Sequence, residues 1–200
     1  MTWEDRYRNE DGYLFGKAPA GFLTENPWVT AGCETALCVA DGEGRNAVHL
    51  ARQGLHVTSF DFSPTAVARA KDLAKQHDVA LATSVSDWSA FDWTPQFDLV
   101  VGIFIQFAPP DLRVQQFADM KAATKAGGRV ALHGYRPEQV VLGTGGPPNA
   151  AHMYTEEMLR AAFEGWQIER LASFERDVQE GRGHSGKSAL IDLVATKPRG

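Results

Sequence analysis

Apolar residues recur in short runs separated by longer amphipathic stretches, and this pattern predicts strands that alternate with helices. The strand-like runs cover residues 36–40, 56–61, 79–84, 97–105 and 129–135. The stretches between them carry apolar residues at helical spacing, which predicts helices over 44–53, 64–78 and 110–125 and a further helix that begins at Thr155. Strands that alternate with helices form a parallel sheet covered on both faces.

The expected helix ends carry residues typical of caps. Gly54 follows the first helix at the position that favours a left-handed backbone. Ser63 and Pro64 suit the N-cap and first turn of the second helix. Gly127 and Gly128 are expected to stop the third helix near Lys125.

The chain ends differently, because its last two predicted strands, residues 166–176 and 187–197, follow each other without a helix. The glycine-rich stretch EGRGHSG, residues 180–186, joins them and predicts a hairpin, so one strand of the pair runs antiparallel to the rest. The expected fold class is therefore α/β: one doubly wound, Rossmann-like domain with a seven-stranded, mostly parallel sheet and a C-terminal antiparallel hairpin.

Composition fits a single globular domain over residues 1–200, with 44% apolar residues, 22% charged residues and a net charge of −5. No basic run of the kind found in nucleic-acid-binding proteins is present. No stretch reaches the ~18 apolar residues of a membrane span. The first residues, MTWEDRYRNEDGY, are too charged for a secretory signal, so we expect a cytoplasmic protein. Cys33 and Cys38 match no zinc or redox spacing, and no metal site is expected.

The turn after the first strand, ADGEG at residues 40–44, is a candidate ligand site because ligands of doubly wound sheets bind at the carboxyl ends of strands. A phosphate-binding loop is excluded because no Lys follows the glycines. Asp41 and Glu43 flank Gly42, and these two carboxylates would repel a pyrophosphate and favour a cationic sulfonium ligand. An ordinary turn between strand and helix is the plain alternative.

Asp61 ends the second strand, seventeen residues after Gly44. A carboxylate at this place accepts hydrogen bonds from ribose hydroxyls in dinucleotide-binding and adenosyl-binding proteins. Asp61 could instead cap the helix that follows, but Ser63 already supplies that cap. We therefore expect Asp61 to bind ribose.

These segments resemble the class I S-adenosylmethionine-dependent methyltransferases over nearly the whole chain. The resemblance rests on LCVADGEGRN, VTSFDFSPTAVARAK, SDW, FDLVVGIF and AGGRVAL. Within that family the chain is most similar to the small tellurite-resistance-type methyltransferases, through the motifs WxxRY at 3–7, FGxxP at 15–19, GRN at 44–46 and ERxxxEGxxHxG at 175–186. The chain departs from the family pattern at two places: Cys38 replaces the usual first-strand acid, and Ala40 replaces the first glycine.

The resemblance implies S-adenosylmethionine as cofactor and assigns residues to its parts. Asp61 would bind the ribose and Phe62 would lie against the adenine. Asp87 and Trp88 would hold the adenine edge, although Asp87 could equally be a turn acid and Trp88 a core aromatic. The cofactor-binding residues implied for the methionine part are Ala40, Asp41, Gly42, Gly44, Arg45, Ile103 and Phe104.

Methyl transfer needs a nucleophile aligned with the methyl carbon, and a base only where the nucleophile must lose a proton. Candidates at the acceptor side are Gln106 and Tyr135, after the fourth and fifth strands, and His184 in the hairpin turn. His184 is expected to orient or deprotonate the acceptor near pH 7, and a solvated surface histidine is the alternative. His133 is expected to be a structural histidine. Residues 104–107, FIQF, differ from the tetrad of amino-methylating relatives.

Residues 1–30 are expected to fold over the core, residues 36–200, as a lid. The residues expected to touch substrate from the lid or from strand ends are Arg6, Tyr7, Phe15 and Arg136; Tyr7 and Phe15 could instead cover the core edge. The expected function is methyl transfer to a small molecule, with a thiol or a tellurium or selenium oxyanion as acceptor. Oxygen or nitrogen methylation, a non-catalytic cofactor-binding protein and a nicotinamide reductase are the alternatives. The oligomeric state is left open.

Overall fold

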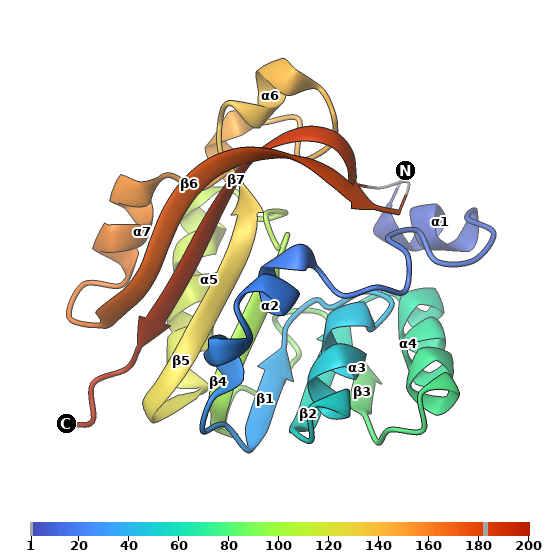
Figure 1. Ribbon diagram of the computed structural model, residues 1–200, viewed down its shortest axis with the longest axis horizontal. Coiled ribbons are helices and arrows are strands. Elements are labelled where there is room, and N and C mark those ends of the chain that lie inside the picture. The colour runs from blue at the N-terminus through green and yellow to red at the C-terminus, as the bar shows by residue number, and fades with distance from the viewer. Residues whose placement is uncertain (1, 182–183) are drawn as a thin grey trace.

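The computed structural model describes residues 2–181 and 184–200 and is built around a seven-stranded sheet with the order β3-β2-β1-β4-β5-β7-β6 (Figure 1). Adjacent strands among β1 to β5 pair in parallel, and β7 pairs antiparallel with both β5 and β6. This topology confirms the predicted fold class. The strands are β1 (Thr35–Cys38), β2 (His56–Asp61), β3 (Ala82–Val85), β4 (Phe97–Ile103), β5 (Thr124–Tyr135), β6 (Gln167–Glu180) and β7 (His184–Thr196).

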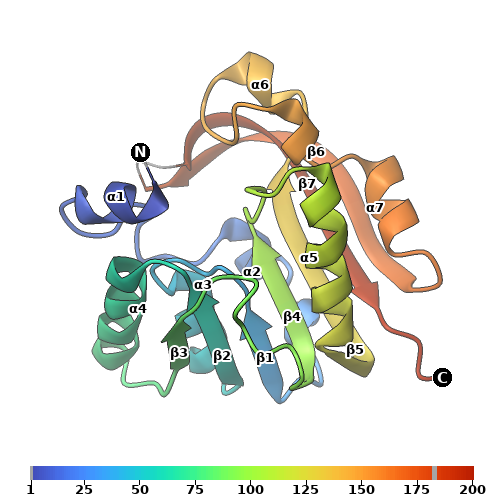
Figure 2. The ribbon, with the colours of Figure 1, turned by 180° about the vertical axis from the view of Figure 1, so that it is seen from behind.

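Helices cover both faces of the sheet. The helices are α1 (Trp3–Arg8), α2 (Gly21–Glu25), α3 (Arg45–Arg52), α4 (Pro64–Gln76), α5 (Pro110–Ala122), α6 (Gln139–Leu142) and α7 (Glu156–Ala162), with 3₁₀ turns at Pro27–Thr30 and Ala150–His152. Figure 2 shows α5 and α7 on one face, and Figure 1 shows α2 and α3 on the other. No helix in the described part of the chain is long and apolar enough to cross a membrane.

Strand β1 is buried on both sides, which explains its unbroken apolar sequence. Leu37 packs in the core cluster that contains residues of α5 and α7, whereas Ala36 and Cys38 pack in the cluster that contains residues of α2 and α3. Successive side chains of a strand point to opposite faces, so each face of β1 faces its own helical layer. The ligand turn that follows β1 is therefore held from both sides.

The caps expected for α3 and α4 are present. Gly54 adopts φ 93° just after α3, and Ser63 accepts a hydrogen bond from the backbone N–H of Ala66 as the N-cap of α4. Because the Ser63 side chain supplies this cap, the Asp61 carboxylate is not needed as the N-cap of α4 and is available for other contacts.

The expected end of α5 is wrong, since Gly127 and Gly128 lie within β5 rather than after a helix. The helix ends at Ala122, and the carbonyl of Ala123 already accepts a hydrogen bond from Phe97 N–H at 2.8 Å. A Cβ at Gly128 would lie 2.9 Å from the Asp98 carbonyl oxygen, so glycine there permits close pairing of the strands. Cross-strand pairing thus overrides the helix-stopping role that glycine pairs often play.

The C-terminal hairpin is longer, and its turn shorter, than the sequence predicted. Strand β6 continues to Glu180 and β7 begins at His184, and these two residues are paired. His184 is therefore a strand residue and not part of a seven-residue turn. Arg182 and Gly183, which belong to the predicted turn, lie outside the described residues.

The N-terminal segment contains a short helix, α1, that the apolar pattern did not predict. Thr2 and Asp5 form a capping box, which supplies hydrogen bonds to an otherwise marginal helix. Glu4 fixes α1 to the start of α4, accepting hydrogen bonds from the Thr65 hydroxyl at 2.7 Å and from the Ser63 hydroxyl. Figures 1 and 2 show α1 beside the start of α4, at the edge of the sheet where the parallel strands end.

Candidate active site

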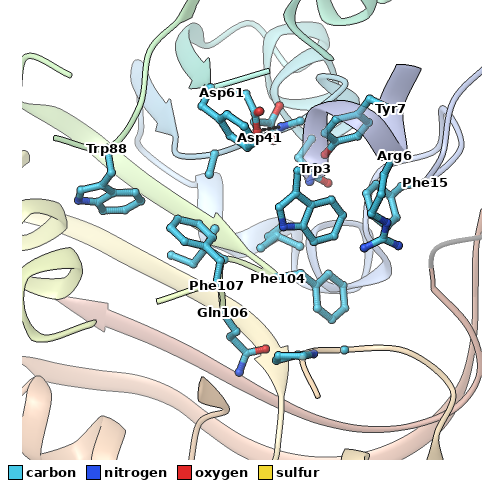
Figure 3. A pocket seen from close by; sticks show the side chains of 18 of the residues that line it. Trp3, Arg6, Tyr7, Phe15, Asp41, Asp61, Trp88, Phe104, Gln106 and Phe107 are labelled. Atoms are coloured by element: carbon cyan, nitrogen blue, oxygen red, sulfur yellow. Dashed lines mark hydrogen bonds between the residues drawn. The ribbon is translucent and has the colours of Figure 1, made fainter. Parts of the chain in front are cut away.

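A cavity of about 840 Å³ lies at the carboxyl ends of β1, β2, β4 and β5. In Figure 3, Asp41 and Asp61 lie on one side of it and Phe104 and Gln106 on the other, with the Trp3 ring between them. The residues that line it are Trp3, Arg6, Tyr7, Phe15, Ala40, Asp41, Gly42, Arg45, Asn46, Phe60, Asp61, Phe62, Ser86, Asp87, Trp88, Ser89, Ile103, Phe104, Ile105, Gln106, Phe107, Tyr135, Gly145, Gly146, Pro147, Pro148, His152 and His184. Most of the predicted site residues are thus brought together.

The first turn is built on left-handed backbone. Gly42 and Gly44 have φ of 61° and 83°. A Cβ at Gly42 would lie 2.6 Å from the Tyr7 hydroxyl oxygen, and one at Gly44 would lie 2.6 Å from the Ala70 Cβ. Ala40, which stands where relatives have glycine, also has a positive φ of 46°, a conformation that strains an L-residue. The turn keeps its left-handed shape although its first glycine is absent.

Asp61 joins the first turn to the start of α4. Its Oδ2 accepts a hydrogen bond from Gly42 N–H and its Oδ1 accepts one from Ser63 N–H, both at 2.9 Å. The side chain lines the cavity although the residue is only 5% exposed, and burial raises the pKa of its carboxyl. A carboxylate oxygen can accept more than one hydrogen bond, so Asp61 can also receive ligand hydroxyls.

Only one of the two acids of the first turn faces the cavity. Asp41 lines it, and its Oδ2 accepts a hydrogen bond from Ala47 N–H at 3.2 Å. Burial raises the pKa of Asp41 to about 7. Glu43 instead pairs with Arg69, at 2.8 Å between Oε1 and Nη1, and is not among the lining residues. The expectation that both carboxylates would act on the ligand is therefore wrong, because Arg69 draws Glu43 away.

The residues expected at the adenine lie along one wall of the cavity. Asp87 accepts hydrogen bonds from Ser89 N–H and Ala90 N–H, both at 2.9 Å, so it also stabilises its own turn. Trp88 packs against Phe60 and donates its indole N–H to Asp119 at 2.8 Å. Both residues thus combine a structural contact with a place in the cavity wall. Phe62, at 45% exposure, lies at the cavity edge, and Ile103 lines the wall that β4 contributes.

Gln106 is buried, and its amide is occupied by the backbone of Tyr135. Its Nε2 donates to the Tyr135 carbonyl and its Oε1 accepts from Tyr135 N–H, both at 2.7 Å. A Cβ at Gly134 would come 2.7 Å from Oε1, so glycine makes room for this clamp. The geometry gives Gln106 a role in positioning Tyr135. Phe104, with φ 56°, packs on the Tyr135 ring at 4.7 Å between centroids.

His184 lies in an aromatic cluster at the start of β7. Its ring centroid is 4.0 Å from that of Phe104 and 4.5 Å from that of Phe15. Burial, and then the nearby charge of Arg45, lower the pKa of His184 to about 3. The histidine is therefore neutral near pH 7 and a weak base, contrary to the expectation that it would titrate there.

The structure agrees with the expectations for His133 and for the residues of the N-terminal segment, but not with the expectation for Arg136. His133 is buried, and its Nδ1 lies 2.6 Å from Asp192 Oδ1, which confirms its structural role. Arg6, Tyr7 and Phe15 line the cavity as expected. Arg136 is not among the lining residues; its Nε lies 3.8 Å from a carboxylate oxygen of Glu138.

Sequence reasoning missed three features of the cavity. Trp3 lines it, with the Arg6 guanidinium 4.1 Å from the centroid of the Trp3 ring. Glu180 pairs with Arg45 at 2.7 Å, and the loop 145–148 closes one side. Trp3 and Glu180 both lie in motifs that carried the family resemblance, so a signal existed; the loop offered only glycine and proline.

The two sides of the cavity suit different chemistries. The side around Asp61 offers a carboxylate for hydroxyl groups, the rings of Phe62 and Trp88 for a flat base, and a glycine-rich turn that allows close approach. The Asp41 carboxylate there suits a positive charge. These groups fit an adenosyl sulfonium ligand. The other side, around His184 and Tyr135, is mainly aromatic.

Comparisons with known proteins agree with this geometry. Residues 36–128 match the family described as methyltransferase domain. Glycine/sarcosine N-methyltransferase of Parasynechococcus marenigrum (strain WH8102) is 38% identical over 72 residues, which are 35% of this chain and only 26% of that protein. The chain thus matches about a quarter of the length of this curated relative.

Two solved structures share the fold. One comes from work on the conversion of a disulfide bond into a thioacetal group during echinomycin biosynthesis; it is 19% identical, with a TM-score of 0.80, and the match covers 98% of this chain and 91% of the other. TehB from Haemophilus influenzae is 17% identical, with a TM-score of 0.71, over 91% of this chain and 63% of that one. At such identities the likeness concerns the fold alone.

Proposed function

We propose that the cavity transfers the methyl group of S-adenosylmethionine to a small-molecule acceptor, because residues 36–128 match the methyltransferase domain family and the cavity lies at the ends of the strands in this region. The observation that carries this proposal is Asp61, a buried carboxylate bound to the glycine turn and open to a cavity that continues to His184. One continuous cavity therefore offers room for a cofactor and for a second molecule.

The chain's own residues divide the binding of the cofactor among them. Asp61 accepts the ribose hydroxyls, while Phe62 and Trp88 hold the flat base with Asp87 at its edge. The turn from Ala40 to Gly44 and the backbone at Ile103 and Phe104 hold the amino-acid part. When bound, the cofactor supplies a methyl group attached to a positively charged sulfur. The Asp41 carboxylate complements that charge.

The remaining cavity residues position the acceptor and exclude water. Trp3 and Phe15 line the cavity from the N-terminal segment, and Glu4 holds that segment against α4. We propose that this segment acts as the lid, so that an enclosed acceptor is held close to the methyl carbon. Neutral His184 orients the acceptor by hydrogen bonding and is not a strong base.

A substrate screen identifies the chemical class of the methyl acceptor. Thiols, tellurite and selenite are the acceptors that the family resemblance favours, while the name of the curated relative points to small amines. The screen measures release of S-adenosylhomocysteine with thiols, both oxyanions, phenols and amines. Release with one class, lost in Asp61→Asn and kept in the control Asp72→Asn at an exposed site of α4, supports the proposal. Cofactor binding with no release for any class would instead indicate a non-catalytic binding protein.

A further inference from the structure

Two buried polar atoms in the aromatic side of the cavity lack a hydrogen-bond partner within the described residues. They are the Tyr135 hydroxyl oxygen and the Nδ1 of His184. Tyr135 is 2% exposed and His184 is 7% exposed, and both line the cavity. Buried polar groups are rarely left unpaired, because an unmade hydrogen bond costs the desolvation of the group. The pair therefore points to a ligand group.

The cavity distinguishes this pair from an ordinary packing defect. The Tyr154 hydroxyl is also buried without a partner among the described residues, but Tyr154 packs in the core and does not line the cavity. The rings of Tyr135 and His184 are neighbours, 5.7 Å apart between centroids, so the two unpaired atoms belong to one part of the cavity. Burial raises the pKa of Tyr135, which keeps its hydroxyl a donor.

The charges around the pair disfavour a cationic acceptor. Three lining residues are acidic, namely Asp41 in the first turn, Asp61 at the end of β2 and Asp87 after β3. Arg45 and Arg6 are cations that line the same cavity; after burial, which is the main cause, their charges help to lower the pKa of His184, while the charge of Glu180 opposes this effect. Glu180 lies near the Tyr135–His184 pair, but Arg45 engages it at 2.7 Å and it does not line the cavity. No carboxylate among the described lining residues of that side is therefore free to pair with a protonated amine beside His184.

The type of unpaired atom favours oxygen over sulfur. The Tyr135 hydroxyl donates and a neutral imidazole nitrogen can accept, so a ligand hydroxyl can accept the first bond and donate the second. A thiol is a weak donor and a weak acceptor and would leave both buried atoms poorly paired. The rings of Phe15, Phe104 and Trp3 around this space suit an aromatic body through edge and stacked contacts.

We propose that this side of the cavity binds an acceptor with an aromatic hydroxyl group, held by the Tyr135 hydroxyl and His184 Nδ1. This inference rests on the proposed methyl transfer and names its substrate class. In the transfer, the acceptor oxygen bonds to the methyl carbon and the electron pair of the broken carbon–sulfur bond stays on sulfur. The hydroxyl proton is released to water as the carbon–oxygen bond forms, while His184 only accepts a hydrogen bond, so the ether product is neutral.

The test is calorimetric binding of three matched probes, 4-ethylphenol, 4-ethylbenzenethiol and 4-ethylbenzylamine, to the full chain saturated with S-adenosylhomocysteine. The phenol is expected to bind at least about fivefold more tightly than either other probe, the effect of one well-formed hydrogen bond. Tyr135→Phe should remove its advantage over the thiol. His184→Phe removes the second partner and should have the same effect, which protects the test if one variant fails to fold.

Tyr154→Phe is the matched control, because it deletes an unpaired buried hydroxyl outside the cavity and should keep the preference. Three results would overturn the inference. The thiol or amine could bind as tightly as the phenol or more tightly, or the preference for the phenol could survive in folded Tyr135→Phe or His184→Phe. The third result is that no probe binds to the protein saturated with S-adenosylhomocysteine. Any of these results leaves methyl transfer to another acceptor intact. Failure of S-adenosylhomocysteine itself to bind would overturn the proposed function instead.

Discussion

Arg45 and Glu180 form a largely buried ion pair, 2.7 Å between Nη2 and Oε2, although 135 residues separate them in the chain. Arg45 is the first residue of α3, directly after the glycine turn, and Glu180 ends β6. Glu180 also accepts a hydrogen bond from Gly21 N–H at 3.0 Å, and Arg45 donates to the Ala18 carbonyl at 3.3 Å. The pair therefore ties the cofactor turn, the C-terminal hairpin and the N-terminal segment together.

Glu180→Ala is expected to lower the free energy of unfolding by about 3 kcal/mol, because it leaves the Arg45 guanidinium buried without its partner. Chemical denaturation measures the change. Glu175→Ala is the control, since Glu175 pairs with Lys187 at 2.9 Å on the surface, where an ion pair contributes little, and its loss should be much smaller. Equal losses of unfolding free energy in the two variants would show that burial does not make the Arg45–Glu180 pair more stabilising than a surface ion pair.

Gly44→Ala is expected to destabilise the protein by more than about 2 kcal/mol, through both a strained φ and a clash. The new Cβ would lie 2.6 Å from the Ala70 Cβ and 2.8 Å from its Cα. Gly54 has a similar φ, 93°, but a Cβ added there would meet no atom within 4 Å, so Gly54→Ala isolates the backbone strain. Thermal unfolding of both variants should show the larger loss at position 44. If Gly54→Ala lost as much stability as Gly44→Ala, the close contact between Gly44 and Ala70 of α4 would not contribute to the stability of the turn.

Much of this architecture could be predicted from sequence, because the strand pattern and the caps at Ser63 and Gly54 act locally. The position of Asp61 at a strand end likewise predicted its place in the cavity. The ion pair of Glu43 with Arg69 could not be predicted, since Arg69 lies on α4, far from Glu43 in the sequence. The same holds for His184, whose neutral state depends on packing against Phe15 and Phe104. Such long-range contacts leave no periodic signal.

Asp41 is expected to make cofactor binding depend on pH. Its pKa is about 7 in the folded protein, above its usual value, because burial disfavours the charged form. The folded state then binds more protons than the unfolded state, so the contribution of Asp41 to stability falls as pH rises from about 4 to about 7. A cationic ligand favours the carboxylate, so S-adenosylmethionine should bind more tightly at pH 8 than at pH 6 and release protons near pH 7.

Calorimetry at pH 7 in buffers of different ionisation enthalpy measures this proton release. Asp41→Asn should abolish most of it and flatten the change of affinity between pH 6 and pH 8. The same variant should lose more affinity for S-adenosylmethionine than for the uncharged sulfur of S-adenosylhomocysteine. An unchanged pH dependence in Asp41→Asn would assign the titration to another group.

Glu4 is expected to control how fast ligand leaves the cavity, because it fixes α1, and with it Trp3, to the start of α4. In Glu4→Ala the dissociation rate of S-adenosylhomocysteine should rise by at least about tenfold, since a lid released from its anchor opens more often. Stopped-flow displacement measures this rate. Arg8→Ala removes only an exposed partner of Glu4, 3.0 Å away, and should behave like the wild type. Identical rates in all three proteins would show that the segment is not a lid.

The most direct test of the account is the affinity of S-adenosylhomocysteine for the wild type, Asp61→Asn and Ser63→Ala, measured by calorimetry with NADH as the comparison ligand. The account predicts binding of S-adenosylhomocysteine and none of NADH. Loss of the Asp61 charge should weaken binding by about 2–4 kcal/mol. Ser63→Ala removes the helix cap and one of the hydroxyls that hold Glu4, so it should lower stability by about 1 kcal/mol and weaken binding less than Asp61→Asn does. NADH binding, or unchanged S-adenosylhomocysteine affinity in folded Asp61→Asn, would contradict it.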